Sequence, residues 1–256
     1  AASDVYKRQA LIDIQKTFTA VKWFIEGDIK GFFDNINHDV LINILRERIA
    51  DERFLRLIRK FLNAGYVEDW VFHRTYSGTP QGGIISPILA NIYLDKFDKY
   101  IKEYTNRFNK GVTRKGDARY KLYEQRRYRL AKKLKNEKDV KVRELMTAEI
   151  KRLREERNNY PARNEMDSSI KRLKYVRYAD DFLIGITGSL EDCKTVKEDI
   201  KNYLNEALKL ELSDEKTLIT NAQKPAKFLG YDVFIRRCND LRKDKFGRTV
   251  RAFGHK

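Results

Sequence analysis

One stretch of sequence decides the fold: Leu173-Lys174-Tyr175-Val176-Arg177-Tyr178-Ala179-Asp180-Asp181-Phe182-Leu183-Ile184-Gly185-Ile186. Apolar, aromatic and β-branched residues at strand spacing flank its Ala-Asp-Asp tip, which predicts a strand, a tight turn and a second strand. Two adjacent, partly desolvated carboxylates repel, and each raises the pKa of the other unless a cation lies between them. Hard oxygen ligands of this kind suit Mg²⁺ or Mn²⁺. The alternative interpretation is a plain polar turn, because Asp is a common turn residue.

Length and charge narrow the class of protein. A chain of 256 residues can bury a large core, as one large domain or two small ones. Its 54 Lys and Arg against 37 Asp and Glu give a net charge of +17, which predicts a polyanionic partner, nucleic acid first. We expect no membrane partner, since no stretch has the roughly 18 apolar residues of a spanning helix. Cys193 and Cys238 lack disulfide or metal spacing, which predicts reduced, structural thiols.

The first third of the chain carries a third acid in a strand context. Residues 1–9 resemble a non-native leader and are set aside, and apolar spacing predicts a helix over 10–21. A buried strand, 23–29, then contains Asp28 near its end, and Asp34 is interpreted as a turn residue. Helices are predicted to begin at Asn37 or His38 and after Asp51, followed by a short hairpin within 65–76.

A glycine-rich loop, 77–83, precedes a long helix. Ser86 is predicted as its N-cap and Pro87 as part of its first turn. Free N–H groups and the helix dipole at such an N-terminus favour an anion or a nucleotide.

Residues 102–174 differ from the rest in charge. They hold 24 Lys and Arg against 11 Asp and Glu, so most of the net positive charge lies there. One interpretation is a solvated, charge-laced helical pair. The other is a nucleic-acid clamp, favoured because the imbalance exceeds what solubility requires. After the Asp pair, the pattern predicts a helix over 192–208, a strand over 216–219 and another over 228–235.

The order of these motifs resembles the palm and part of the fingers of a reverse transcriptase, and more narrowly the proteins encoded by group II introns. The resemblance covers roughly 10–235 and rests on Gly-Asp-Ile-Lys-Gly-Phe-Phe-Asp (27–34), Gly-Thr-Pro-Gln-Gly-Gly-Ile-Ile-Ser-Pro (78–87), Tyr-Ala-Asp-Asp (178–181) and Leu-Glu-Leu-Ser-Asp-Glu-Lys-Thr (210–217). It implies an α+β right-hand polymerase palm, an antiparallel sheet backed by helices, with a basic helical insertion. The implied segments are a leader (1–9), a first part of the palm and fingers (10–101), the insertion (102–174), a second palm part (175–235) and the start of a connection (236–256).

The resemblance also implies the chemistry, which is phosphoryl transfer assisted by two Mg²⁺ ions, with Mn²⁺ as a substitute. Asp28 and Asp180 would bridge the metals, Asp181 would assist, and the Ile29 carbonyl would complete a shell. Lys216 lies where the family carries a lysine that protonates the leaving pyrophosphate; a plain surface lysine is the alternative.

Substrate contacts follow from the same resemblance. The backbone of Lys30, Gly31 and Phe32 is predicted to contact the triphosphate. Gln81 and Gly82 are predicted to contact the templating and incoming nucleotides. The predicted contact to the primer end consists of Phe228, Leu229 and Gly230. An ordinary hairpin core is the alternative for the last three. Phe33 resembles the family's steric gate against a ribose 2′-hydroxyl, and a core aromatic is its alternative.

The implied function is an RNA-directed DNA polymerase that copies an intron RNA from a DNA primer with dNTPs, in a protein that also assists splicing. A different class is an RNA-binding maturase without polymerase activity, which loss of one of the three Asp would favour. A third possibility is the polymerase of a retron, a diversity-generating element or a CRISPR-linked system. Bacterial cytoplasm or an organellar matrix is the implied compartment. The family's upstream fingers and thumb have no match here, so a poorly active fragment is expected.

Overall fold

The structure is a computed structural model and describes residues 2–68, 71–73, 77–79, 84–160, 162–164, 167–238, 241–243, 249–251 and 254–255. The chain forms two compact units. The first is Ala1–Asn109 with Lys171–Ile235, and the second is Lys110–Ile170 with Arg236–Lys256. The predicted insertion, 102–174, is longer than Lys110–Ile170, the first segment of the second unit. The two ends of the predicted insertion belong to the first unit, where they complete a helix and begin a strand.

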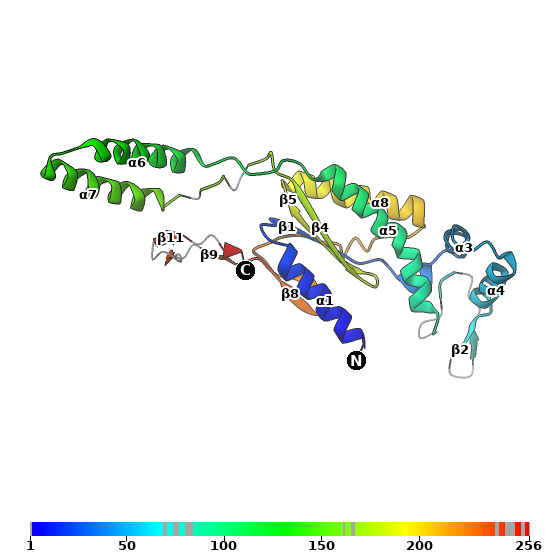
Figure 1. Cartoon of the computed structure of the whole chain (residues 1–256). Helices are drawn as coiled ribbons and strands as arrows, with labels where there is room; N and C mark the ends of the chain where they lie inside the picture. Colours follow the sequence, from blue (N-terminus) through cyan, green and yellow to red (C-terminus); the bar gives the residue numbers. More distant parts are fainter. Residues whose placement is uncertain are drawn as a thin grey trace. The chain divides into compact units, whose positions relative to one another are not determined.

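A four-stranded antiparallel sheet, in the order β4-β5-β1-β6, forms the centre of the first unit (Figure 1). Its strands are β1 (Trp23–Gly27), β4 (Arg172–Tyr178), β5 (Asp181–Thr187) and β6 (Ile219–Asn221). The β4–β5 hairpin pairs Tyr178 with Asp181, and Ala179 between them has a left-handed backbone with a φ of 54°. The predicted strand, tight turn and strand around the Asp pair are therefore confirmed.

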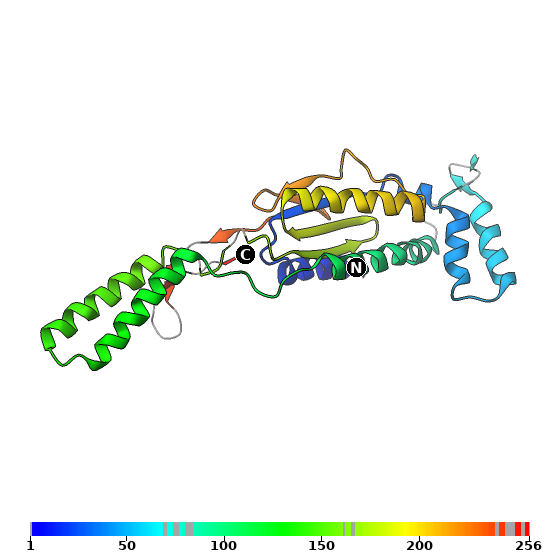
Figure 2. The same cartoon turned by 90° about the horizontal axis from the view of Figure 1, so that it is seen from above.

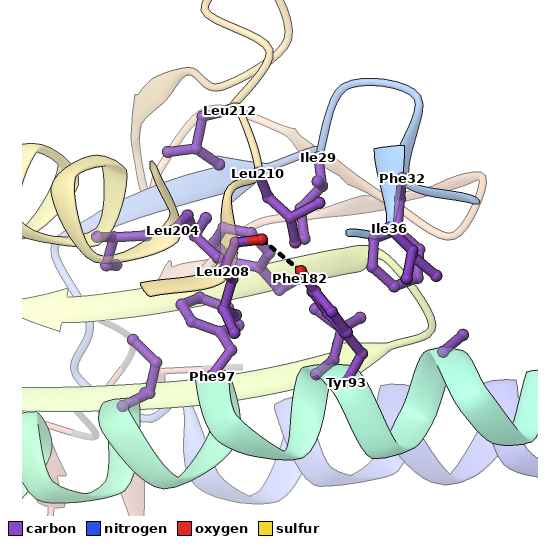
Figure 3. Close-up of a cluster of buried hydrophobic side chains, with 14 of the residues drawn as sticks. Ile29, Phe32, Ile36, Tyr93, Phe97, Phe182, Leu204, Leu208, Leu210 and Leu212 are labelled. Carbon is purple, nitrogen blue, oxygen red and sulfur yellow. Dashed lines mark hydrogen bonds between the residues drawn. The ribbon is translucent and has the colours of Figure 1, made fainter. Parts of the chain in front are cut away.

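The two faces of the sheet pack against different elements, because side chains alternate along a strand. Ile25 of β1 belongs to the larger core, which also holds the buried faces of α5 and α8. In that core the Tyr93 hydroxyl donates to the Leu208 carbonyl at 2.5 Å, which joins α5 to the end of α8 (Figure 3). Phe24, the neighbour of Ile25, belongs to a second core with α1, β7 and β8. The bounds of these elements are α1 (Ala2–Thr17), α5 (Ser86–Phe108), α8 (Leu190–Leu208), β7 (Ala226–Phe228) and β8 (Tyr231–Val233).

Between β1 and α5 the chain forms short helices and a hairpin. They are α2 (Phe32–Asn35), α3 (His38–Arg46), α4 (Glu52–Asn63), β2 (Tyr66–Glu68) and β3 (Val71–His73). The Asn37 side chain caps α3 by accepting from two backbone N–H groups, and Asp51 caps α4 in the same way. Both predicted helix starts and the predicted hairpin within 65–76 are confirmed.

Several boundaries differ from the sequence-based expectations. Helix α1 begins at Ala2, so residues 2–9 continue it instead of forming a separate segment. Ser86 is not an N-cap: it is a buried residue of the first turn, and Ile85, with helical backbone angles, precedes it. Lys216 lies in a turn, and β6 begins only at Ile219, because the Thr217 N–H donates back to the Ser213 carbonyl. The predicted strand 228–235 is instead the end of β7, a turn and β8.

The second unit contains an antiparallel pair of long helices, α6 (Ala118–Asn136) and α7 (Val140–Arg157) (Figure 2). Asp117 and Asp139 cap them. Glu124 accepts from Arg127 and, across the pair, from Arg157, and these hydrogen bonds lower the pKa of Glu124 to about 2. The remaining strands pair as β9 (Arg237–Cys238) with β12 (Gly254–His255), and β10 (Leu241–Lys243) with β11 (Thr249–Arg251).

Two further expectations concern thiols and membranes. Cys193 is buried and free, and burial raises the pKa of its thiol to about 12, in keeping with a structural role. The side chain of Cys238 lies outside the described residues. Among the residues that the structure describes, no helix is long and apolar enough to cross a membrane.

Candidate active site

The register of the sheet brings the first acid to the Asp pair. Gly27 of β1 pairs with Phe182 of β5, so the next position of the same register places Asp28 opposite Asp181. Directly opposed residues of antiparallel strands point to the same face, with Cβ atoms roughly 4.5–5.5 Å apart. Asp180 is the neighbouring residue in the hairpin turn. Three acids from two distant segments therefore gather at one end of the sheet.

The electrostatics of the three acids agree with this placement. Burial is the largest cause that raises the pKa of Asp181, followed by the negative charges of Asp180 and Asp28. The positive charges of Lys216 and Lys7 partly offset the rise. A half-buried carboxylate with two like-charged neighbours is stabilised by a cation, and carboxylate oxygens are ligands that Mg²⁺ accepts.

The donor types thus fit a divalent ion, although the side chains are not arranged as a finished site. Within the described parts of the chain, no group of three His, Cys, Asp or Glu residues is arranged to hold a metal ion. Instead, Lys216 Nζ lies 3.3 Å from Asp28 Oδ2 and supplies the positive charge. Mg²⁺ sites of this kind usually take part of their shell from substrate phosphates, so a complete cage of protein ligands is not required.

The turn after Asp28 agrees only in part with its predicted role in phosphate binding. The Lys30 N–H donates to the Glu211 carbonyl, which leaves it unavailable to a triphosphate. Gly31 has a left-handed backbone and precedes α2, so the N–H groups of Gly31 and Phe32 stay candidates. The Ile29 backbone pairs with Leu212 as an isolated bridge beside the site.

Phe33 lies in α2, the short helix that follows Gly31, and is half-buried. Its ring packs edge-on against Phe32, with ring centroids 5.3 Å apart, and it borders the larger core. This environment is compatible with a steric gate and with a core aromatic, so both interpretations stay open. Gln81 and Gly82 lie outside the described residues.

The predicted primer grip forms the tip of the β7–β8 hairpin. Phe228 is buried in the core that also holds Phe24, whereas Leu229 and Gly230 form the turn with positive φ angles of 53° and 82°. Glu26, two residues before Asp28, ties this hairpin to the sheet. Its carboxylate accepts from the Lys227 N–H at 2.6 Å and from the Thr220 hydroxyl.

Sequence reasoning missed three sets of contacts around the site. The Arg177 guanidinium binds both carboxylate oxygens of Asp98 on α5 and donates to the Ala179 carbonyl at 2.7 Å, which anchors the hairpin turn. Lys7, from the segment interpreted as a leader, lies 5.9 Å from the centre of the Tyr178 ring. The third contact is that of Glu26. A lone acid inside an apolar strand was the available signal for Glu26, whereas Arg177 and Lys7 stand in ordinary basic surroundings.

A comparison with protein families identifies the family of this chain. The model for "Reverse transcriptase (RNA-dependent DNA polymerase)" matches residues 4–118 and 149–233, and the chain belongs to this family. The reverse transcriptase family generally uses a divalent metal, in agreement with the donor types described above.

Individual relatives are proteins encoded in introns, which confirms the resemblance seen in the motifs. The chain is 44% identical over 237 residues to the group II intron-encoded protein LtrA of Lactococcus lactis, a match that covers 91% of this chain and 38% of that protein. It is 39% identical over 248 residues to the putative COX1/OXI3 intron 1 protein of Saccharomyces cerevisiae, covering 95% of this chain and 28% of that protein. The chain therefore spans well under half the length of these relatives.

Among solved structures, apo telomerase of Candida tropicalis matches 91% of this chain and 38% of its own, with 15% identity and a TM-score of 0.44. A likeness at this level supports no inference about the site.

Proposed function

We propose that the chain is the palm and part of the fingers of a group II intron-encoded RNA-directed DNA polymerase. The observation that carries the proposal is the convergence of Asp28 with Asp180 and Asp181 at one end of the sheet, in a chain of the reverse transcriptase family. The proposed substrates are an intron RNA template, a DNA primer and dNTPs. Assistance to intron splicing by the whole protein belongs to the same proposal.

The three carboxylates have distinct places in the proposed reaction, in which a primer 3′-hydroxyl attacks the α-phosphate of a dNTP and pyrophosphate leaves. Asp28 and Asp180 would hold two divalent ions, with Mg²⁺ as the natural pair and Mn²⁺ as a substitute, and Asp181 would assist. Bound there, the ions supply charge stabilisation for the attacking and leaving oxygens. Lys216 lies beside Asp28 with a largely exposed ammonium group, so it is free to turn from Asp28 toward a phosphate.

Primer extension tests the proposal directly. The chain, mixed with poly(rA), an oligo(dT) primer, dTTP and Mg²⁺ or Mn²⁺, is expected to add nucleotides slowly, and only when a divalent ion is present. EDTA serves as the control. Binding of RNA without any incorporation, under both metals, would contradict the polymerase and favour the maturase alternative.

For the second unit we propose a contact with the RNA through α6. This helix carries eight Lys and Arg against one acid, Glu124, which is held by Arg127 and Arg157. Helix α7 carries six Lys and Arg against four Glu, so its charges nearly balance. The surplus of positive charge in the helical pair therefore belongs mainly to α6, and phosphate neutralisation would occur there.

Charge reversal on α6 is expected to weaken RNA binding and flatten its salt dependence. The double variant Arg129→Glu/Lys133→Glu changes two exposed residues one turn apart. If both contact phosphates, the slope of log affinity against log salt falls in magnitude by about 1.4–1.8. Titration of a labelled RNA by fluorescence anisotropy at several salt concentrations measures the slope. The matched variant Lys141→Glu/Lys151→Glu on α7 should leave the slope nearly unchanged; equal effects from both variants would contradict a contact specific to α6.

A further inference from the structure

His38 is a buried polar residue at a junction of three segments beside the proposed nucleotide site. It is the first residue of α3 and is 8% exposed. Its Nε2 lies 2.7 Å from the Gly78 carbonyl oxygen. Because a carbonyl only accepts, Nε2 carries the proton and donates it. Its Nδ1 lies 3.0 Å from the side-chain amide of Asn63, the last residue of α4. With the proton on Nε2, Nδ1 accepts, and the Asn63 amide donates to it in the orientation that turns its NH2 group toward the ring. Both ring nitrogens therefore have partners.

The segment that His38 holds, residues 77–79, is bound along the turn that carries Phe33. The Thr79 N–H donates to the Phe33 carbonyl at 2.7 Å, and the Gly78 N–H donates to the Ile36 carbonyl at 2.8 Å. The Ser77 hydroxyl donates to the Asp34 carbonyl at 2.9 Å. Three hydrogen bonds in consecutive residues therefore join the start of the glycine-rich loop to the turn 33–36.

The close approach at Gly78 makes the packing of residues 77–79 on the turn tight. Gly78 has a φ of +84°, and a Cβ atom there would lie 2.4 Å from the Phe33 carbonyl oxygen and 2.7 Å from Asp34 Cα. A glycine is therefore needed both for the backbone angle and for the packing. Residues 77–79 therefore pack tightly on the turn 33–36, and His38 holds them there from the side of α3 and α4.

We propose that His38 is a positioning residue for sugar selection in the polymerase reaction. It holds residues 77–79 against the turn, and this contact sets the position of Phe33, the proposed gate against a ribose 2′-hydroxyl. The inference rests on the proposed function. It goes further, because it assigns part of the discrimination between deoxyribose and ribose to His38, a buried residue outside the predicted nucleotide contacts. The hydrogen bond from His38 to the Gly78 carbonyl would act by holding Phe33 in position.

Loss of the imidazole has a defined consequence. In His38→Ala the Gly78 carbonyl loses its buried donor, and an unpaired buried acceptor is costly enough to shift a local equilibrium by roughly 5- to 100-fold. The segment 77–79 would then separate from the turn and Phe33 would lose its backing. His38→Gln is the conservative variant, since its side-chain amide can donate to the Gly78 carbonyl.

The first measurement follows the backbone and needs no catalysis. In His38→Ala, hydrogen exchange at the Gly78 and Thr79 amides should accelerate by roughly 5- to 100-fold, and His38→Gln should restore most of the protection. Tyr104→Phe is the matched control, because it removes one hydrogen bond, to Asp199, at the far end of α5. Unchanged protection in His38→Ala would overturn the proposal.

The second measurement follows sugar selection. In primer extension, the ratio of ribonucleotide to deoxyribonucleotide incorporation should rise about tenfold in His38→Ala, fall back in His38→Gln and stay at the wild-type value in Tyr104→Phe. Accelerated exchange with an unchanged ratio would reduce His38 to structural support and overturn the proposal. Absence of extension by the unaltered chain would contradict the proposed function itself, which is a different outcome from extension with an unchanged ratio.

Discussion

Asp28→Asn and Asp180→Asn are each expected to lower nucleotide incorporation by at least about a thousandfold. Metal-ion stabilisation of a phosphoryl-transfer transition state is worth several kcal/mol, and each 1.4 kcal/mol is about tenfold in rate. An amide keeps the size of the carboxylate but lacks its charge, so the fold should persist while the site would lose a carboxylate ligand for the ions. Single-turnover primer extension with Mg²⁺ measures the loss.

Asp34→Asn is the matched control for these two variants. Asp34 lies near Asp28 in the sequence and is exposed; it belongs to the short helix α2 and not to the turn that the sequence predicts. Incorporation by Asp34→Asn should stay near the wild-type level. A loss comparable to that of Asp28→Asn would contradict the assignment and give Asp34 a place among the metal ligands.

Asp181→Asn separates activity from stability at the same site. The folded-state pKa of Asp181 lies above its ordinary value, so the folded chain holds this proton more tightly than the unfolded chain does. Ionisation of Asp181 therefore destabilises the fold, and the loss of stability develops as the pH rises through the range between the ordinary and the raised pKa. Removing the charge should raise the melting temperature at pH 7 by about 1–4 °C while incorporation falls. A lower melting temperature at pH 7 would contradict this account of the site.

Local patterns in the sequence were sufficient for the hairpin and for the partner strand. Alternation on both sides of Asp180 predicts the β4–β5 hairpin, and an apolar run ending in an acid predicts β1. Antiparallel pairing then places Asp28 beside Asp181. These features depend on neighbours in sequence and on one strand pairing, which is why the pattern suffices.

Contacts between distant segments were beyond the reach of the same reasoning. Arg177 and Asp98 are separated by 79 residues, and nothing in either segment specifies that they meet. For His38 the sequence indicates only a helix start, because its partners, Gly78 and Asn63, depend on how α3, α4 and residues 77–79 pack. The neighbours of Lys216 are suited to strands and therefore predict a strand, whereas a backbone hydrogen bond from the Thr217 N–H to the Ser213 carbonyl makes a turn.

Phe33→Ala is expected to raise ribonucleotide incorporation relative to deoxyribonucleotide incorporation by about a hundredfold. A bulky side chain at the sugar position discriminates through a steric clash, and discrimination by one extra group at an apolar pocket is worth about 1–3 kcal/mol, or 10–200-fold. Phe33 is half-buried and rests edge-on against Phe32, a fully buried residue, so its ring has a firm support. Competition between dTTP and UTP in primer extension on poly(rA) measures the ratio.

The same substitution distinguishes the gate from a core aromatic. Full truncation of a buried Phe costs about 3–5 kcal/mol, and a half-buried ring should cost less. Phe33→Ala is therefore expected to lower the melting temperature whichever role is correct, so stability alone decides nothing. Phe33→Tyr keeps the bulk of the ring and should keep the wild-type sugar ratio. If Phe33→Ala loses stability while its sugar ratio stays at the wild-type value, Phe33 belongs to the core and the gate must be sought among the other residues that face the nucleotide.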